Sequence, residues 1–171
     1  MGKEYLWCPN CSEGQIYLME VAGVERGFYI CSNCNRVWKR YRELDIISSE
    51  WRWHDYLKKM GISPSNMKVT KKKPMLIVEE ENPDDQPPLS KEYLLCPQCA
   101  GNGIMERLSV KGLKEEIDAC DECDLTWEKG TAVQRDSFGL FHHYIEEKGI
   151  PLSKVEITNR RRLIIMEEDQ V

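Results

Sequence analysis

Four pairs of cysteines constrain this chain more than any other feature. Each pair has the pattern C-x₂-C, and together they comprise Cys8, Cys11, Cys31, Cys34, Cys96, Cys99, Cys120 and Cys123. The pairs fall into two groups, with 19 residues between the pairs of the first group and 20 between those of the second. Two such pairs, brought together by a β-hairpin, supply four thiolates to one tetrahedral ion. The sequence therefore predicts two metal centres with these eight ligands.

Paired cysteines have three other common uses: redox chemistry, disulfides and iron binding. A redox C-x-x-C requires a pair at the start of a helix that follows a strand, which four evenly repeated pairs fit badly. A disulfide framework requires an oxidising compartment, whereas the start MGKEYLWCPN has no secretory pattern and no apolar run approaches the roughly 20 residues of a membrane span. We therefore expect a cytoplasmic protein with two structural Zn²⁺ ions. Iron stays open, because four thiolates bind either metal.

The motifs "CPNC…CSNC" and "CPQC…CDEC" resemble those of zinc-ribbon domains with rubredoxin-like knuckles. The resemblance covers about 40 residues around each group, or about half of the chain, and implies a closed Cys₄ site. In such knuckles backbone N–H groups point at sulfur, and a left-handed residue commonly follows the second cysteine. The residues at these places are Ser12, Asn35, Ala100 and Asp124, of which Asn and Asp tolerate positive φ well.

The sequence also repeats itself beyond the cysteines. "HDYLKKMGI" (54–62) matches "HHYIEEKGI" (142–150), and "KVTKKKPMLIVEE" (68–80) matches "EITNRRRLIIMEE" (156–168), each at an offset of 88 residues. Between the copies lies "EEENPDDQPPLS" (79–90), whose acids and prolines favour an extended spacer. We expect a first repeat over 1–80, an acidic Pro-rich linker over 81–89 and a second repeat over 90–171.

Within each repeat the periodicities predict an α+β unit: a zinc ribbon, then a helix, then a β-hairpin. Two strands are expected within 15–31, joined around Gly23, and a short strand within "RVWKRYR" (36–42). Trp53, Tyr56, Leu57 and Met60 follow helical spacing, and Gly61 comes where a helix would end; Gly149 closes the corresponding helix of the second repeat. The last segment is interpreted as two strands joined by a tight basic turn.

No catalytic constellation is evident, so we expect no enzyme and no small-molecule substrate. A closed Cys₄ site has no open position for a reacting water. The His142–Glu146 and His143–Glu147 pairs have helical i, i+4 spacing, which more often reflects surface contacts than acid–base chemistry.

Charge is unevenly distributed and suggests the partner. The net charge is −5, all of it in residues 87–171, and two four-thiolate zinc sites would take it to −9. We therefore expect a non-enzymatic protein–protein interaction module whose partner has a basic face, with antitoxin or immunity-type inhibition as one form of this activity. The acidic candidates for contact are Glu115, Glu116, Asp118, Asp121, Glu122 and Asp124.

The alternative is a nucleic-acid-binding regulator of transcription or translation, since zinc ribbons recur in that machinery. Its contacts would be basic hairpin tips and the Trp- and Tyr-containing segment around 36–42. The candidates are Arg36, Lys39, Arg40, Arg42, Lys71, Lys72, Lys73, Arg160, Arg161 and Arg162.

Overall fold

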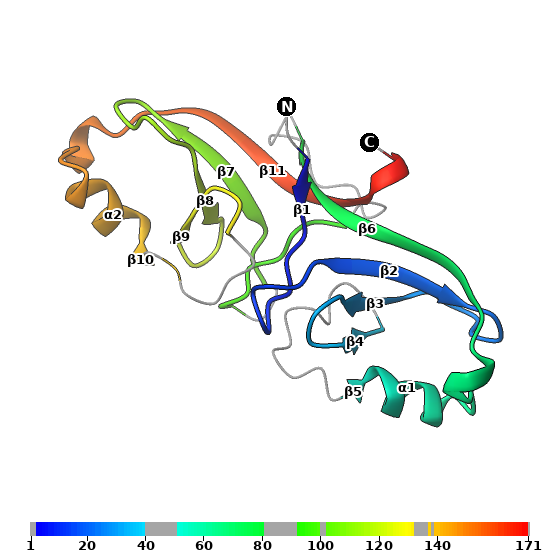
Figure 1. The fold of residues 1–171 in the computed structure, drawn as a ribbon. Helices are drawn as coiled ribbons and strands as arrows, with labels where there is room; N and C mark the ends of the chain where they lie inside the picture. Colours follow the sequence, from blue (N-terminus) through cyan, green and yellow to red (C-terminus); the bar gives the residue numbers. More distant parts are fainter. Residues whose placement is uncertain are drawn as a thin grey trace. The chain divides into compact units, whose positions relative to one another are not determined.

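The computed structural model describes residues 3–39, 51–80, 92–99, 102–131, 137 and 139–170. The chain divides into two compact units (Figure 1). Unit 1 comprises Met1–Leu76 together with Met166–Val171, and unit 2 comprises Ile77–Ile165. Each unit therefore contains a short piece of chain from the other half of the sequence.

Unit 1 is built on short antiparallel strands. Its strands are β1 (Glu4–Tyr5), β2 (Ile16–Val21), β3 (Phe28–Cys31), β4 (Arg36–Trp38), β5 (Trp51–Arg52) and the first part of β6 (Val69–Glu80). Its helical elements are α1 (Trp53–Lys59) and the 3₁₀ turn η2 (Pro64–Asn66). The end of β11 (Ile157–Glu167) and the 3₁₀ turn η4 (Glu168–Gln170) complete the unit. The two strands expected around Gly23 are confirmed as β2 and β3. Gly23 has a φ of 88°, a left-handed value that glycine adopts without steric cost.

Unit 2 contains the corresponding elements in the same order. They are β7 (Met105–Val110), β8 (Ile117–Cys120), β9 (Leu125–Glu128), β10 (Gly139–Leu140), α2 (Phe141–Glu147), η3 (Leu152–Lys154) and most of β11 (Ile157–Glu167), joined by the end of β6. The β7–β8 register places Met105 opposite Cys120, as the β2–β3 register places Ile16 opposite Cys31. The third cysteine of each group thus ends the second strand of a hairpin.

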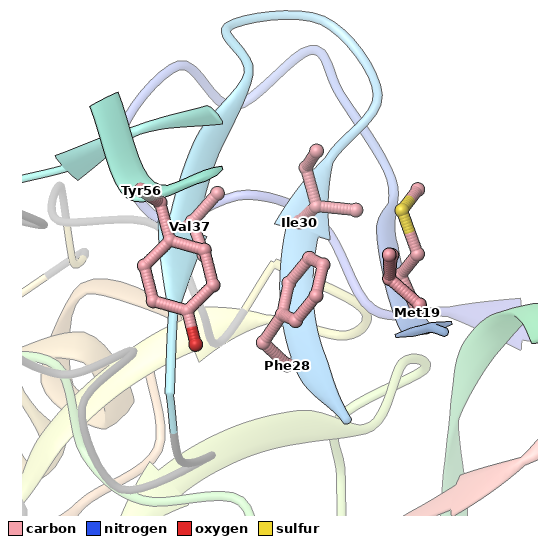
Figure 2. Packing of buried hydrophobic residues seen from close by; sticks show 6 residues of the cluster. Met19, Phe28, Ile30, Val37 and Tyr56 are labelled. Atoms are coloured by element: carbon pink, nitrogen blue, oxygen red, sulfur yellow. The ribbon is translucent and has the colours of Figure 1, made fainter. Parts of the chain in front are cut away.

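Each unit packs its own apolar core against its helix. In unit 1 the core residues Met19, Val21, Phe28, Ile30, Val37 and Tyr56 come from β2, β3, β4 and α1 (Figure 2). The Phe28 ring lies 5.2 Å from the rings of both Trp53 and Tyr56, so the helix is anchored by aromatic contacts. In unit 2 Ile145 of α2 is fully buried against Leu108, Val110, Ile117 and Ala119.

The predicted helices are confirmed as α1 and α2. Gly61 and Gly149, with φ of 72° and 77°, follow directly after the helix C-caps. Of the apolar face expected in α1, Tyr56 and Leu57 are buried, whereas Met60 is 44% exposed. The buried stripe is therefore shorter than the spacing predicted.

The prediction of an α+β protein of two tandem ribbon–helix–hairpin repeats was wrong. The strands form one 11-stranded antiparallel sheet in the order β10-β9-β8-β7-β11-β6-β2-β3-β4-β5, with β1 paired to β6, and α1 and α2 are the two short α-helices of the described residues. No terminal hairpin exists at either expected place. The segment Val69–Glu80 is one continuous strand, as is Ile157–Glu167.

The physical reason lies in the chemistry of the two basic triplets, 71–73 and 160–162, at which turns were predicted. "KKK" and "RRR" contain no residue that favours positive φ, and a strand accepts long cations if its neighbours neutralise them. Lys71 lies opposite Glu20 on β2, with the ammonium 3.5 Å from the carboxylate. The chain therefore runs straight through the basic triplet instead of reversing there.

The acidic segment between the repeats begins within a strand. Glu79 and Glu80 end β6, and the Glu80 carboxylate accepts a hydrogen bond from the Tyr93 hydroxyl at 3.1 Å. Residues 81–89, the predicted linker, lie outside the described residues. The domain bounds inferred from the sequence stay a prediction.

Candidate metal centres

The eight cysteines gather into the two groups that the spacing predicts. Site 1 is Cys8, Cys11, Cys31 and Cys34, and site 2 is Cys96, Cys99, Cys120 and Cys123. In each site the first pair lies in a turn closed by a β-bridge, Trp7–Gln15 or Leu95–Ile104. The second pair lies in the turn after β3 or β8. Local strand pairing thus brings together ligands about 20 residues apart.

The sulfur–sulfur distances fit a tetrahedral metal site and exclude disulfides. In site 1 Sγ of Cys8 is 3.7 Å from Sγ of Cys34, and Sγ of Cys11 is 3.6 Å from Sγ of Cys31. The corresponding distances in site 2 are 3.6 Å for Cys96–Cys123 and 3.7 Å for Cys99–Cys120. A tetrahedron with Zn–S bonds of about 2.3 Å has edges of about 3.8 Å, whereas a disulfide requires about 2.05 Å. Both groups can therefore hold a metal ion.

Backbone amides stabilise the sulfurs as expected for knuckles. In site 1 the N–H groups of Asn33 and Cys34 both donate to Sγ of Cys31 at 3.4 Å. In site 2 those of Glu122 and Cys123 donate to Sγ of Cys120 at 3.4 and 3.5 Å. Each such bond places positive dipole density at a sulfur that is charged when it binds metal.

The left-handed residues after the knuckles are confirmed at three of four places. Ser12, Asn35 and Asp124 have φ of 55°, 57° and 56°, and they are the non-glycine residues with positive φ in the described chain. Ala100 lies outside the described residues. This conformation turns the chain after the second cysteine of a pair so that its sulfur faces the other pair.

Two glycines complete the sites and were not singled out from the sequence. A Cβ on Gly14 would lie 2.3 Å from Sγ of Cys31, and one on Gly103 would lie 2.2 Å from Sγ of Cys120. The carbonyls of the same glycines accept hydrogen bonds from the N–H groups of Cys8 and Cys96. The sequence signal that could have identified them is a glycine shortly after the first cysteine pair of each group. Glycine is required there because a Cβ would collide with a ligand sulfur, and not because the backbone has a positive φ.

Without metal, the four thiols of a site differ in acidity. The neighbouring Cys8 thiol is the main cause that lowers the pKa of Cys31 to about 5, and Cys96 lowers the pKa of Cys120 to about 5 in the same way. Burial raises the pKa of Cys34 and of Cys123. One thiolate per site is therefore formed at neutral pH before any metal arrives.

The six predicted acidic contact residues do not form one face. Asp121, Glu122 and Asp124 are exposed and surround the second knuckle of site 2. Glu115 is exposed but precedes β8, at the end opposite to the knuckle. Asp118 is fully buried, and Glu116 is half-buried and paired with cations. Of the six candidates, Asp121, Glu122 and Asp124 are thus the exposed acids that lie together, at the second knuckle of site 2.

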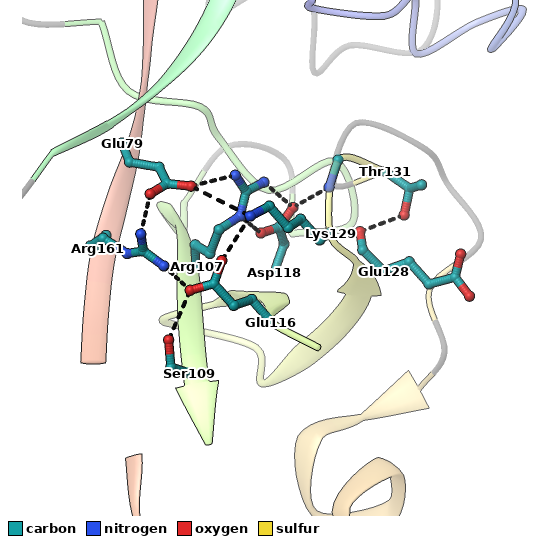
Figure 3. Close-up of polar contacts among 10 residues, drawn as sticks. Glu79, Arg107, Ser109, Glu116, Asp118, Glu128, Lys129, Thr131 and Arg161 are labelled. Atoms are coloured by element: carbon teal, nitrogen blue, oxygen red, sulfur yellow. Dashed lines mark hydrogen bonds and ion pairs between the residues drawn. The ribbon is translucent and has the colours of Figure 1, made fainter. Parts of the chain in front are cut away.

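Asp118 and Glu116 instead belong to a charge network inside unit 2 (Figure 3). Arg107 donates to both oxygens of Asp118, from Nε at 2.7 Å and from Nη2 at 3.0 Å, and to Glu79 at 2.8 Å. Arg161 bonds to Glu79 and Glu116.

Lys129 completes the network, with its ammonium 2.7 Å from Glu116. Partial burial raises the pKa of Glu116, but the bonds from Lys129 and Ser109 and the charge of Arg161 outweigh it and lower that pKa to about 2. Glu116 thus stays ionised at any pH at which the chain is expected to work.

The basic candidates for nucleic-acid contact are largely paired within the chain. Lys71 is 2.7 Å from Glu167, Lys73 pairs with Asp169, Arg160 is 3.3 Å from Glu106, and Lys72 lies over the Tyr17 ring at 4.8 Å. All six residues of the two triplets lie within strands rather than at hairpin tips. Arg36 lies in β4 and Lys39 follows it, whereas Arg40 and Arg42 lie outside the described residues.

Among the described residues, the histidines form no metal cluster with neighbouring acids. His142 and His143 lie in contact on α2, with ring centroids 4.1 Å apart. In the parts of the chain that the structure describes, the two Cys₄ groups are the clusters suited to a metal ion. Nor do these parts contain a helix long and apolar enough to cross a membrane.

Comparison with protein-family models, with curated proteins and with solved structures found no match to this chain.

Proposed function

We propose that the chain is a non-enzymatic protein-binding module held together by two structural Zn²⁺ ions. The observation that carries the proposal is the pair of closed Cys₄ sites with tetrahedral sulfur spacing. Four protein ligands leave no open position on the metal, so the ions staple the units rather than activate water. Thiolate ligands favour zinc over harder cations, and a reducing cytoplasm keeps them available.

Charge supports a protein partner with a basic face over nucleic acid. The chain carries −5 before metal binding, and two zinc–tetrathiolate clusters add further negative charge. Several strand cations that a phosphate backbone would need are already engaged by carboxylates of the same chain. The exposed rim of Asp121, Glu122 and Asp124 is the surface we assign to the partner. Inhibition of a basic toxin, as by an immunity protein, is one activity that such a rim would support.

A capture experiment with matched charge changes tests the assignment. The test variant Asp121→Asn/Glu122→Lys/Asp124→Asn removes the rim charge while retaining residues that tolerate the left-handed backbone and the Asp121 acceptor. The control variant Glu146→Lys/Glu147→Lys changes the net charge by the same four units on exposed positions of α2. We expect the test variant to lose partners that the native chain and the control retain.

Two results would contradict the proposal. Partners that bind the test variant and the native chain equally would remove the rim as the contact surface. A salt-sensitive mobility shift with mixed DNA or RNA at low salt, abolished by neutralising Arg36 and Lys39, would favour nucleic-acid binding instead.

A further inference from the structure

The second knuckles of the two sites have matching backbones but differ in charge. The knuckle of site 1 reads Cys31-Ser-Asn-Cys-Asn35, and that of site 2 reads Cys120-Asp-Glu-Cys-Asp124. Position by position, three neutral residues are replaced by three carboxylates. The backbone matches closely: Asn35 and Asp124 share a φ near 57°, and both third cysteines accept two amide N–H bonds.

The first of the three exchanged residues performs the same task in both sites. Ser32 Oγ accepts a hydrogen bond from the Gln15 N–H at 3.0 Å, and Asp121 Oδ1 accepts one from the Ile104 N–H at 2.7 Å. Each bond ties the knuckle to the strand that follows the first pair. The carboxylate is therefore not required for the fold, since a hydroxyl serves there in site 1.

The second exchanged residue acts on the sulfur itself. Asn33 Nδ2 lies 3.9 Å from Sγ of Cys11 and donates to it, and it also donates to Glu13 at 3.0 Å. Glu122 holds the corresponding place in site 2, and an ionised carboxylate has no hydrogen to donate. The thiolates of site 1 thus gain an amide donor that the Glu122 position of site 2 cannot provide, while Glu13 is the carboxylate at the rim of site 1.

We propose that site 2 is the labile metal centre of this chain and site 1 the inert one. A zinc ion held by four thiolates makes a cluster with a net charge of −2. Nearby carboxylates disfavour that negative cluster, and donors to sulfur stabilise it. The same carboxylates leave the thiolates of site 2 more nucleophilic. Solvent exposure of the ligands would not by itself make one site more labile than the other, because both sites have two buried and two half-buried cysteines in the same order.

The inference rests on zinc occupying both clusters, so the first measurement is the zinc content of the purified chain. Two ions per chain are expected. A chain without zinc contradicts the metal assignment on which the inference rests, whereas a chain that retains a single ion in site 2 overturns the inference alone. The two-zinc chain is then treated with N-ethylmaleimide, an uncharged reagent that the carboxylates do not attract or repel. A thiolate sulfur adds to the maleimide double bond, a Zn–S bond breaks, and the maleimide carbon takes a proton from water. The released zinc is followed with a chromophoric chelator.

We expect two phases of zinc release that differ about tenfold in rate. Peptide mass spectrometry after the fast phase should find the label on the cysteines of site 2. Equal rates, or label appearing first on the cysteines of site 1, would overturn the proposal.

Exchanging the knuckles provides the matched control. Asp121→Ser/Glu122→Asn/Asp124→Asn places the site 1 residues in site 2, and Ser32→Asp/Asn33→Glu/Asn35→Asp does the reverse. The first variant should slow the fast phase, and the second should speed the slow one. If one exchange variant fails to bind two zinc ions, the release rates of the other variant and of the single change Glu122→Asn still test the role of the carboxylates. Knuckle exchanges that leave both rates unchanged would show that the carboxylates have no such role.

Discussion

Arg107 and Asp118 form a two-pronged ion pair across β7 and β8, with the Arg107 Nε 2.7 Å from Asp118 Oδ1 and both side chains buried. Asp118 also accepts the Gly130 N–H at 3.0 Å. At the matching register of unit 1 the pair is Leu18 opposite Tyr29. One fold position is therefore occupied by an ion pair in unit 2 and by an uncharged leucine–tyrosine pair in unit 1.

Breaking this pair on one side should be costly, whereas replacing both partners should not. Arg107→Leu removes the cation beside the buried Asp118, and Asp118→Tyr removes the carboxylate that bonds Arg107 twice and leaves it with Glu79; we expect each to lower the free energy of unfolding by about 3–5 kcal/mol. The double change Arg107→Leu/Asp118→Tyr copies the unit 1 pair and should cost far less than the sum of its single changes. Urea unfolding of the zinc-loaded chain measures both. Additive losses would show that the two side chains act independently.

Alanine at Gly14 or Gly103 should empty the adjacent metal site. The new Cβ would lie within 2.3 Å of a ligand sulfur, closer than any non-bonded contact allows. We expect each variant to bind one zinc ion instead of two, as measured by metal analysis. Gly61→Ala is the control: its Cβ has open space, so it should keep both ions and lose about 1 kcal/mol of stability through its positive φ alone. A two-zinc Gly14→Ala chain would contradict the close-approach argument.

Removing residues 166–171 should weaken unit 1 and spare unit 2. This segment belongs to unit 1, where Glu167 is 2.7 Å from Lys71 and Glu168 is 2.6 Å from Lys3. The exposed Lys3–Glu168 pair contributes at most about 1 kcal/mol, whereas the Lys71–Glu167 pair is half-buried; the backbone of β11 should account for much of the remaining effect. Hydrogen exchange should accelerate in β2 and change little in β7. The full-length variant Glu167→Gln/Glu168→Gln separates the charges from the backbone, and equal acceleration in both units would contradict the assignment.

Zinc binding should release one more proton per site below pH 5 than above it. Cys31 and Cys120 have pKa values of about 5 in the metal-free chain, so above that pH each is already a thiolate and has no proton to lose. Below pH 5 each must lose its proton, and affinity should fall more steeply as pH decreases. Calorimetry of zinc binding in buffers of different ionisation enthalpy counts the protons. A constant number between pH 4 and pH 7 would contradict the lowered pKa.

The local features of the metal centres could be predicted from the sequence because they depend on short-range chemistry. The spacing of the eight cysteines identified them as metal ligands. The tolerance of Asn and Asp for positive φ indicated where the chain turns after Cys34 and Cys123. Gly61 and Gly149 likewise indicated where the helices end. Each of these outcomes depends on a few neighbouring residues, whose preferences can be read directly.

Tertiary structure decided the features that depend on distant partners. From the sequence, Lys71 was expected in a turn, but it lies within a strand because Glu20 and Glu167 neutralise its charge. Asp118 was expected at the surface, but it is buried because Arg107 pairs with it. Six residues at the end of the sequence complete a unit that starts at its beginning. The sequence gives the charge of each side chain directly. Whether that charge is buried, paired or exposed depends on which strand packs next to it, and the neighbouring strand is determined by the tertiary fold of the whole chain.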